Sequence, residues 1–121
     1  MDVFSEVFTT TGRLNRRTHF KYQMIWIVLI MLATVTSSLM VEFLTGDPAN
    51  ERANTIGGVL VFIWMIGFFT IHTRRLHDLN LSGLLSILIF VPVLGVFFWL
   101  YMFFAQGTVG SNQYGEEPLT D

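Results

Sequence analysis

The sequence predicts an all-α integral membrane protein, a small bundle of three transmembrane helices. Hydrophobic residues make up 52% of the chain and charged residues 13%, which is about half the charged share of a soluble domain. Three apolar stretches, at residues 22–41, 56–73 and 84–105, each approach the roughly 20 residues that a helix needs to cross a bilayer. Twelve phenylalanines and six methionines are more than the core of a soluble domain of 121 residues buries. We therefore expect one membrane domain over residues 1–121, with lipid solvating most apolar side chains.

The segment before the first span, residues 1–21, is amphipathic and then basic. Four apolar side chains fall on one helical face: Val3, Phe4, Val7 and Phe8. This spacing predicts a short helix at the membrane surface, with a frayed terminus as the alternative. A break at Thr11-Gly12 is followed by four basic residues: Arg13, Arg16, Arg17 and Lys21.

The first span, residues 22–41, contains no charged residue but carries a small polar strip near its end, formed by the hydroxyl groups of Thr34, Ser37 and Ser38. We expect these hydroxyls to bond to carbonyls of their own helix or to contact a neighbouring helix. The connection that follows, residues 42–55, is hydrophilic and turns at Gly46-Asp47-Pro48.

The second span, residues 56–73, contains Gly57, Gly58 and Gly67. Glycine lets the backbones of neighbouring helices approach closely in a membrane, so we expect close contacts here. For Gly57 and Gly58 a loosely formed helix start is the alternative.

The third apolar segment, residues 84–105, follows a predicted helix N-cap at Ser82 and is interrupted by Pro92 and Gly95. Proline removes a backbone donor and crowds the preceding turn, which predicts one span kinked at this point. The alternative is two spans plus a re-entrant hairpin that turns at Pro92 to Gly95. Each arm would have about 8–10 residues, too few to cross. We favour the kinked span because non-helical backbone in a membrane needs shelter.

The tail, residues 106–121, is rich in glycine and asparagine and is predicted to form a loop. We expect Tyr114 to pack at the membrane interface and Asn112 to bond to its own backbone. Its glycine-rich part lacks the lysine of a phosphate-binding loop, so no cofactor is expected.

The distribution of basic residues predicts the orientation of the chain in the membrane. Basic residues beside a span stay in the cytoplasm, which places the amino terminus and Arg74-Arg75 there. The connection 42–55 carries a single basic residue, Arg52, and is placed outside. With three spans the tail also lies outside, whereas with a re-entrant hairpin the tail is cytoplasmic.

Several short motifs occur in one order along the chain. They are Gly12-Arg13 with Arg16-Arg17, then Arg74-Arg75-Leu76-His77-Asp78, Ser82-Gly83, Pro92 with Gly95, and a final stretch containing Gly107, Gly110, Asn112, Tyr114, Gly115 and Pro118. Over essentially the whole chain this pattern resembles the domain-of-unknown-function 805 family of small bacterial inner-membrane proteins. Leu84 departs from it, since tryptophan often follows Ser-Gly in such proteins. The resemblance implies a multi-pass protein of the bacterial plasma membrane and carries no established activity.

Basic side chains predicted on the cytoplasmic side form a candidate binding surface. Arginine matches the geometry of phosphate and carboxylate groups, so we expect this surface to hold anionic lipid or a partner protein. The alternative is that the arginines only orient the spans and reach toward lipid headgroups, with Arg74 and Asp78 spaced to pair on a continuing helix. The candidate anion-binding residues are Arg13, Arg16, Arg17, Arg74, Arg75 and His77.

Two hypotheses of other classes accompany the binding hypothesis. One is a channel or transporter subunit with a broken helix at Pro92 to Gly95. No acidic or basic residue lies in the middle of a span, which argues against an ion-coupled carrier made of this chain alone. Three spans are also few for enclosing a path, so this role would need a homo-oligomer or a membrane-protein partner. The other is a lipid-headgroup enzyme with His77 as the base and Asp78 orienting it.

Metal and nucleic-acid binding are not predicted. The residues that suggest a metal site are His19, His72, His77 and Asp78, but no two histidines have the i,i+4 spacing of helical zinc ligands, and the chain has no cysteine. His72 and His77 are five residues apart. The formal net charge of -2 gives no reason to expect a nucleic-acid partner.

Overall fold

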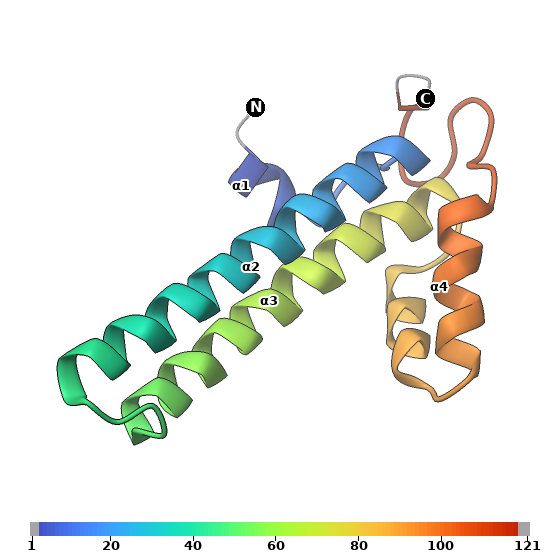
Figure 1. The fold of residues 1–121 in the computed structure, drawn as a ribbon. Helices are drawn as coiled ribbons and strands as arrows, with labels where there is room; N and C mark the ends of the chain where they lie inside the picture. Colours follow the sequence, from blue (N-terminus) through green and yellow to red (C-terminus); the bar gives the residue numbers. More distant parts are fainter. Residues whose placement is uncertain (1–2, 119–121) are drawn as a thin grey trace.

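The computed structural model describes residues 3–118, which are helical or irregular with one isolated bridge between Asn112 and Gly115 (Figure 1). Residues 1, 2 and 119–121, at the outer ends of the predicted segments 1–21 and 106–121, lie outside the described part. The elements are α1 (Val3–Val7), α2 (Arg16–Thr45), α3 (Glu51–Asp78), the 3₁₀ helix η1 (Gly83–Phe90) and α4 (Leu94–Phe104).

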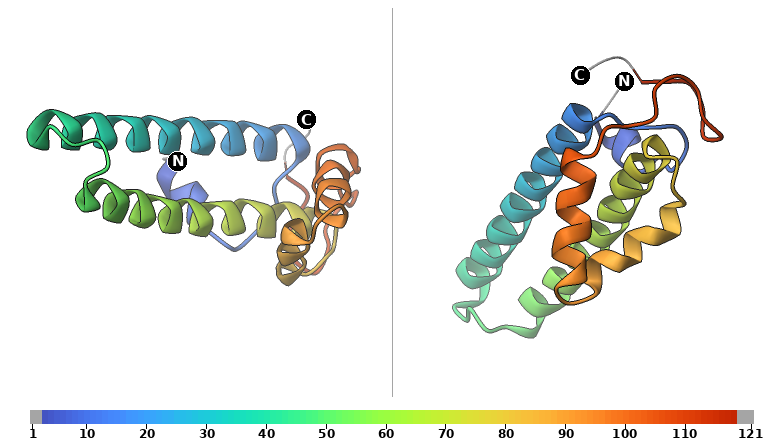
Figure 2. Two further views of the ribbon diagram at one scale, coloured as in Figure 1. Left: turned by 60° about the horizontal axis from the view of Figure 1, so that its bottom comes forward. Right: turned by 90° about the vertical axis from the view of Figure 1, so that its right-hand side faces the viewer.

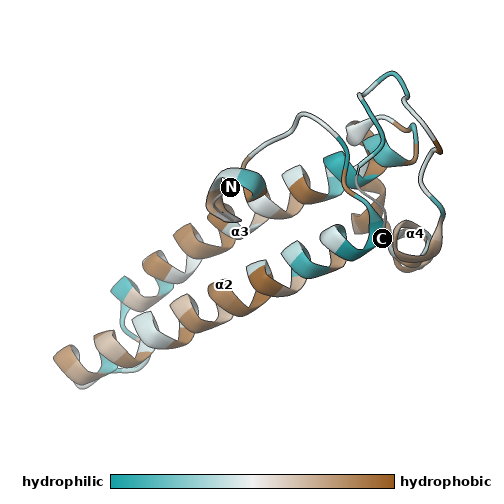
Figure 3. Ribbon diagram, turned by 90° about the horizontal axis from the view of Figure 1, so that it is seen from above, coloured by the Kyte–Doolittle hydropathy of each residue, from teal (hydrophilic) through white to brown (hydrophobic). Residues whose placement is uncertain are grey.

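Helices α2 and α3 form a long antiparallel hairpin that dominates the molecule (Figures 1 and 2). Their 30 and 28 residues correspond to about 45 and 42 Å, more than the roughly 30 Å of a hydrocarbon core. Both are long and apolar enough to cross a membrane, and they contain the predicted spans 22–41 and 56–73. Only 11% of the most apolar 18-residue stretch of α2, and 28% of that of α3, is buried. Most of these apolar residues therefore lie on the outside of the hairpin, which is unlike the core helices of a soluble protein. Figure 3 shows that both helices are hydrophobic over most of their length.

Local signals determine where the two long helices begin and end. The Asn15 side chain caps α2 by accepting from the backbone N–H of Thr18 at 2.8 Å. Gly46 ends α2 with φ of 70°, a left-handed conformation that glycine adopts without strain, as expected for the predicted turn. Within α2, Thr34 and Ser37 bond to carbonyls of their own helix, the first of the two predicted arrangements.

Helix α3 packs tightly against α2 at Gly67. A Cβ atom there would lie 2.6 Å from Cζ2 of Trp26 and closer still to two other atoms of its ring system. The indole is held in place because its Nε1–H donates to the carbonyl of Trp64 at 3.1 Å. No atom lies within 4 Å of the corresponding positions at Gly57 and Gly58, so the predicted close contact is found at Gly67 and not at these two glycines within this chain.

The third apolar segment differs from the single kinked helix that we expected. Residues 83–90 form η1, the chain turns at residues 91–93, and α4 runs back beside η1 (Figures 1 and 2). The arms are about 16 Å long each, roughly half the thickness of a hydrocarbon core. The alternative that the sequence offered, a hairpin that turns at Pro92 to Gly95, describes this geometry. Ser82 caps the first arm as predicted, accepting from Leu84 N–H at 3.4 Å.

The turn between the arms depends on the proline and the glycine that were predicted to interrupt the segment. Pro92 has no N–H to continue a helix, and Val93 has φ of 66°, which reverses the chain direction. The N–H of Gly95 donates to the carbonyl of Val91 at 2.7 Å. A Cβ atom at Gly95 would lie 2.6 Å from the carbonyl carbon of Ile89, so only glycine lets the two arms approach this closely.

The return of the chain through α4 brings the described part of the tail, residues 106–118, to the end of the molecule where α2 begins and α3 ends (Figure 1). This part of the tail is a loop with turns, as predicted. Hydrophilic residues gather at the same end (Figure 3).

Substituting Gly67 with leucine should destabilise the hairpin, because the new side chain would overlap the Trp26 ring. We expect the free energy of unfolding to fall by about 3 kcal/mol, at the upper end for overpacked positions. Gly58→Leu is the matched control, since it adds the same side chain to the same helix in open space. Thermal unfolding of both variants in detergent measures the difference, and equal stability of the two would contradict the contact.

Candidate functional site

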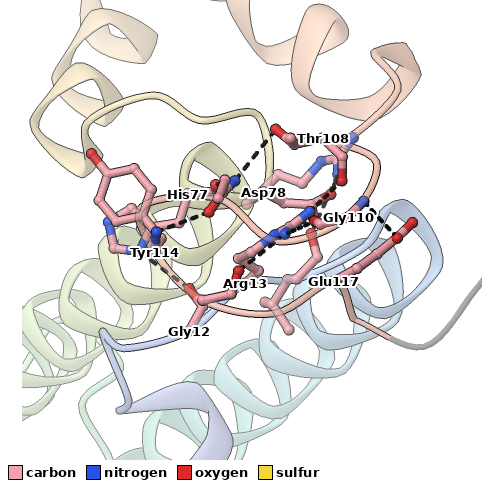
Figure 4. Close-up of polar contacts among 12 residues, drawn as sticks. Gly12, Arg13, His77, Asp78, Thr108, Gly110, Tyr114 and Glu117 are labelled. Carbon is pink, nitrogen blue, oxygen red and sulfur yellow. Dashed lines mark hydrogen bonds and ion pairs between the residues drawn. The ribbon is translucent and has the colours of Figure 1, made fainter.

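The run Arg74-Arg75-Leu76-His77-Asp78 forms the last turns of α3, where four parts of the chain meet. These are the N-terminal segment, the end of α3, the end of α4 and the tail, as Figure 4 shows for the residues around Asp78. Apart from His77, the side chains of this run are buried: Arg75 and Leu76 are 0% exposed, Asp78 3% and Arg74 8%. The expectation of an exposed arginine surface therefore does not hold at Arg74 and Arg75.

The carboxylate of Asp78 lies between two arginines. Its Oδ1 accepts from Nε of Arg13 at 3.1 Å and pairs with Nη2 of the same side chain at 3.0 Å. Its Oδ2 accepts from Nη1 of Arg75 at 2.6 Å. We call Arg13, Arg75 and Asp78 the aspartate clasp. It joins residues 65 positions apart in the sequence, and its bonds are charge-assisted, which makes them stronger than neutral hydrogen bonds.

Arg75 also connects the clasp to the end of α4. Its Nε donates to the carbonyl of Met102 at 2.7 Å, and its Nη2 donates to the carbonyl of Ala105 at 2.6 Å. The last carbonyls of a helix lack partners within the helix and carry partial negative charge. The guanidinium thus caps α4 while it neutralises Asp78.

Arg13 connects the clasp to the tail. Its Nη1 donates to the carbonyl of Gly110 at 2.6 Å, and its Nη2 donates to the carbonyl of Thr108. The N–H of Thr108 in turn donates to the backbone carbonyl of Asp78 at 2.7 Å. Tail and helix approach so closely that a Cβ atom at Gly107 would lie 2.6 Å from the carboxylate carbon of Asp78.

Arg74 holds the N-terminal helix rather than forming the pair with Asp78 that its spacing suggested. Its Nη1 lies 2.7 Å from Oε2 of Glu6 and 3.0 Å from the carbonyl of the same residue. One turn earlier, the Thr70 hydroxyl donates to the carbonyl of Val7. Sequence reasoning missed Glu6, because a contact across 68 residues leaves no spacing pattern to read.

His77 packs against the tail from the other side. Its ring stacks on Tyr114 with ring centroids 3.9 Å apart and an interplanar angle of 5°. Its Nδ1 lies 3.1 Å from the carbonyl of Gly12, and the backbone carbonyl of His77 accepts from Nδ2 of Asn112 at 2.8 Å. Asn112 also accepts from the N–H of Tyr114 at 2.9 Å, the local backbone bond that was predicted.

The remaining motif residues of the sequence also have defined positions. Gly83 lies against Thr73, where a Cβ atom would lie 2.9 Å from the threonine hydroxyl. Gly110 and Gly115 have φ of 77° and 131°, values that suit glycine in the turns of the tail. Glu117 accepts from the N–H of Gly110 at 2.7 Å. Residues of the sequence motifs therefore lie in the turns of the tail and at contacts near the end of α3.

Arg16 and Arg17 differ from the other candidate arginines. Both side chains are exposed, at the first two positions of α2. The six candidate anion-binding residues thus divide into three buried arginines that hold other parts of the chain (Arg13, Arg74 and Arg75), a half-buried His77 and this exposed pair.

A second polar cluster lies within the helix bundle. His19 and Gln23 of α2 and His72 of α3 are 0%, 4% and 0% exposed, and the two imidazole rings meet edge to face with centroids 5.0 Å apart. Within the described residues, both nitrogens of His19, Nε2 of His72 and Oε1 of Gln23 have no hydrogen-bond partner. No three His, Asp or Glu residues of this part gather as a metal ion would require. No spacing pattern indicates that His19 and His72 are in contact, because they lie on different helices.

Replacing Asp78 with asparagine should destabilise the protein strongly, because Arg13 and Arg75 would remain buried without a counter-charge. Removing one partner of a buried ion pair costs about 3–5 kcal/mol. Glu116→Gln is the matched control, since its side chain is exposed and such changes usually stay within about 0.5 kcal/mol. The stability of both variants is measured by thermal unfolding in detergent. An Asp78→Asn protein as stable as wild type would show that the clasp contributes little.

Comparisons with known proteins find one relative that is similar over nearly the whole chain and another that is similar over about a third of it. The inner membrane protein YhaH of Escherichia coli (strain K12) is 27% identical over 122 residues, which cover 98% of this chain and 97% of YhaH. The inner membrane protein YhaI of the same strain is 49% identical over 45 residues, so this match spans 37% of the chain and 38% of YhaI. No solved structure matches.

A family model described as "Protein of unknown function (DUF805)" matches residues 7–116. The match includes α2, α3, η1, α4 and both sides of the aspartate clasp. The resemblance that the motifs indicated is confirmed, and the chain belongs to the DUF805 family, whose named relatives are inner membrane proteins.

Proposed function

We propose that this protein is a bacterial inner-membrane module that binds anionic phospholipid through Arg16 and Arg17 at the cytoplasmic surface. In this proposal α2 and α3 cross the membrane, η1 and α4 form a re-entrant hairpin, and both chain ends lie in the cytoplasm. The inner-membrane names of YhaH and YhaI support the location.

The charge distribution supports the orientation. Six of the seven lysine and arginine residues belong to the segment before and at the start of α2 or to the end of α3; the seventh is Arg52, beside the α2–α3 connection. Basic residues beside a span remain in the cytoplasm. The opposite connection, residues 42–55, carries Glu42, Asp47 and Glu51 besides Arg52. The amino terminus and the clasp are therefore assigned to the cytoplasmic side.

The hairpin geometry supports two crossings in place of three. Neither η1 nor α4 is long enough to span a hydrocarbon core. Arg13 donates to tail carbonyls, so the tail shares a side with the start of α2. Ser86 of η1 is buried at 3% exposure, and its hydroxyl donates to the carbonyl of Gly83 at 2.7 Å, so this polar side chain is satisfied within η1.

The observation that carries the binding proposal is the exposed pair Arg16 and Arg17 at the start of an apolar helix. Guanidinium groups bind phosphate oxygens through paired hydrogen bonds, and basic side chains next to a span are attracted to anionic lipid. The aspartate clasp and the Arg74–Glu6 pair engage the buried arginines with groups of this chain. Anion binding is assigned to Arg16 and Arg17 because their side chains are exposed at the start of α2.

The contacts of His77 and Asp78 give the hypothesis of a lipid-headgroup enzyme less support than the binding hypothesis. It needs Asp78 to orient His77, yet both Asp78 oxygens accept from arginines, and Nδ1 of His77 lies beside the carbonyl of Gly12. These contacts favour a structural role for Asp78 and for His77.

The proposed topology predicts that both ends of the chain face the cytoplasm. A reporter that is active only in the cytoplasm, fused after residue 121, should therefore be active. The same reporter placed in the connection 42–55 should be inactive. Three crossings would give the opposite result for the tail fusion and would overturn the proposed hairpin topology.

The proposed function predicts that Arg16→Gln/Arg17→Gln loses its preference for anionic lipid. Each arginine near an anionic surface contributes about 1 kcal/mol, so the preference for phosphatidylglycerol over phosphatidylcholine should fall about ten-fold or more. Native mass spectrometry of the purified full chain with a mixture of both lipids measures the retained lipid.

Arg52→Gln serves as the control for loss of charge, because Arg52 lies at the opposite end of α3. It should retain the preference of wild type. An unchanged preference in the Arg16/Arg17 variant, with unfolding temperature also unchanged, would refute anionic-lipid binding at this pair and leave a protein partner as the hypothesis to test.

A further inference from the structure

We infer that a groove between the start of α2 and the end of α4 binds a single phospholipid with a net negative headgroup, which places its phosphate at Arg16 and Arg17 and one acyl chain along the groove. This inference rests on the proposed function and specifies its site and its ligand class.

The groove has a volume of about 480 Å³ and is lined from both helices. Helix α2 contributes Arg16, Phe20 and Met24, which recur every four residues and therefore share one helical face. The rise along the helix from Arg16 to Met24, eight positions, is about 12 Å. Helix α4 contributes the opposite wall, with Trp99 and Leu100. The volume is within the range of about 300–1,000 Å³ that is usual for small-molecule sites.

Charge is confined to one end of the groove. Arg16 and Arg17 are in the first turn of α2, and the other side chains that line the groove are aromatic or aliphatic. Figure 3 shows the same arrangement, with hydrophilic residues at the start of α2 next to the apolar α4. A ligand that fits this surface has one anionic end and one long apolar part, which describes a lipid and excludes free phosphate.

The side chains that line the groove also favour an anionic over a zwitterionic headgroup. They include two guanidinium groups and, among the described residues, no carboxylate that would pair with an ammonium group. Asp78 and Glu117 line a separate cavity of about 190 Å³ that shares Arg16 with the groove. An ammonium group beside Arg16 and Arg17 would meet like charge, whereas a phosphate meets two donors of fixed geometry.

Trp99 lies in the groove wall and provides a direct measurement. The full chain is reconstituted in phosphatidylcholine vesicles that contain a small share of phosphatidylglycerol with brominated chains, which quench nearby tryptophan. The signal of Trp99 is the difference between wild type and Trp99→Phe. We expect quenching that corresponds to a local enrichment of about five-fold or more over the bulk share, the effect of one well-placed arginine at an anionic surface. Brominated phosphatidylethanolamine should show no enrichment.

Met24→Phe/Leu100→Phe fills the groove and keeps both arginines. It should bring the quenching of Trp99 down to the bulk level. Leu32→Phe/Leu39→Phe is the matched control, because both leucines are 59% exposed on α2 away from the groove, and it should behave as wild type.

The outcomes separate this inference from the proposed function. If the groove-filling variant keeps the enrichment at Trp99 and Arg16→Gln/Arg17→Gln loses it, the groove inference is wrong and surface binding of anionic lipid stands. If the arginine variant keeps the enrichment, the proposed function fails as well. Equal enrichment of phosphatidylethanolamine at Trp99 would overturn the assigned headgroup class.

Discussion

A buried carboxylate between two buried arginines is the constraint on which the polar end of this molecule depends. A guanidinium removed from water is stable only when its charge is neutralised and its donors find acceptors. Asp78 provides the charge, and carbonyls of α4 and of the tail provide acceptors. The N-terminal segment, α4 and the tail must therefore meet at the end of α3. The aspartate clasp explains why residues far apart in the sequence form one compact region beside two long, apolar helices.

The clasp also constrains the route of the chain. The tail begins directly after α4 and has to reach Arg13, so the segment between α3 and the tail must leave and return at the same end. Pro92 and Gly95 make the return possible, the first by ending η1 without a donor and the second by allowing close approach to Ile89. The result is a hairpin whose arms are little more than a third as long as α2 and α3, with a groove between its α4 arm and the start of α2.

Much of this architecture was predictable from local signals. The apolar stretches indicated α2 and α3, Ser82 indicated the start of η1, and Gly46 indicated the turn after α2. The kinked third span was the wrong choice between two predicted alternatives, because a proline has the same local effect in a kink and in a turn. What decides between them is the contact of Arg13 and Arg75 with the chain beyond Pro92, and no spacing rule reports such contacts.

The candidate site shows the same division between local and distant information. The sequence identified Arg74, Arg75, His77 and Asp78 as a group but predicted an exposed surface, since composition does not reveal burial. Burial became visible only with Glu6, the α4 carbonyls and the stacked Tyr114 in place. Arg16 and Arg17, which sequence reasoning treated like the other arginines, differ because their side chains are exposed at the start of α2.

The contacts of Arg13 have a consequence for biosynthesis. Synthesis proceeds from the amino terminus, so Arg13 and Asp78 leave the ribosome well before Thr108 and Gly110, whose carbonyls complete the coordination of the guanidinium. A nascent chain can assemble its two long helices early, but its charged end closes only when the last residues emerge. The fold can therefore be completed only after Thr108 and Gly110 have been synthesised. A product that terminates before them lacks the carbonyls that Arg13 binds.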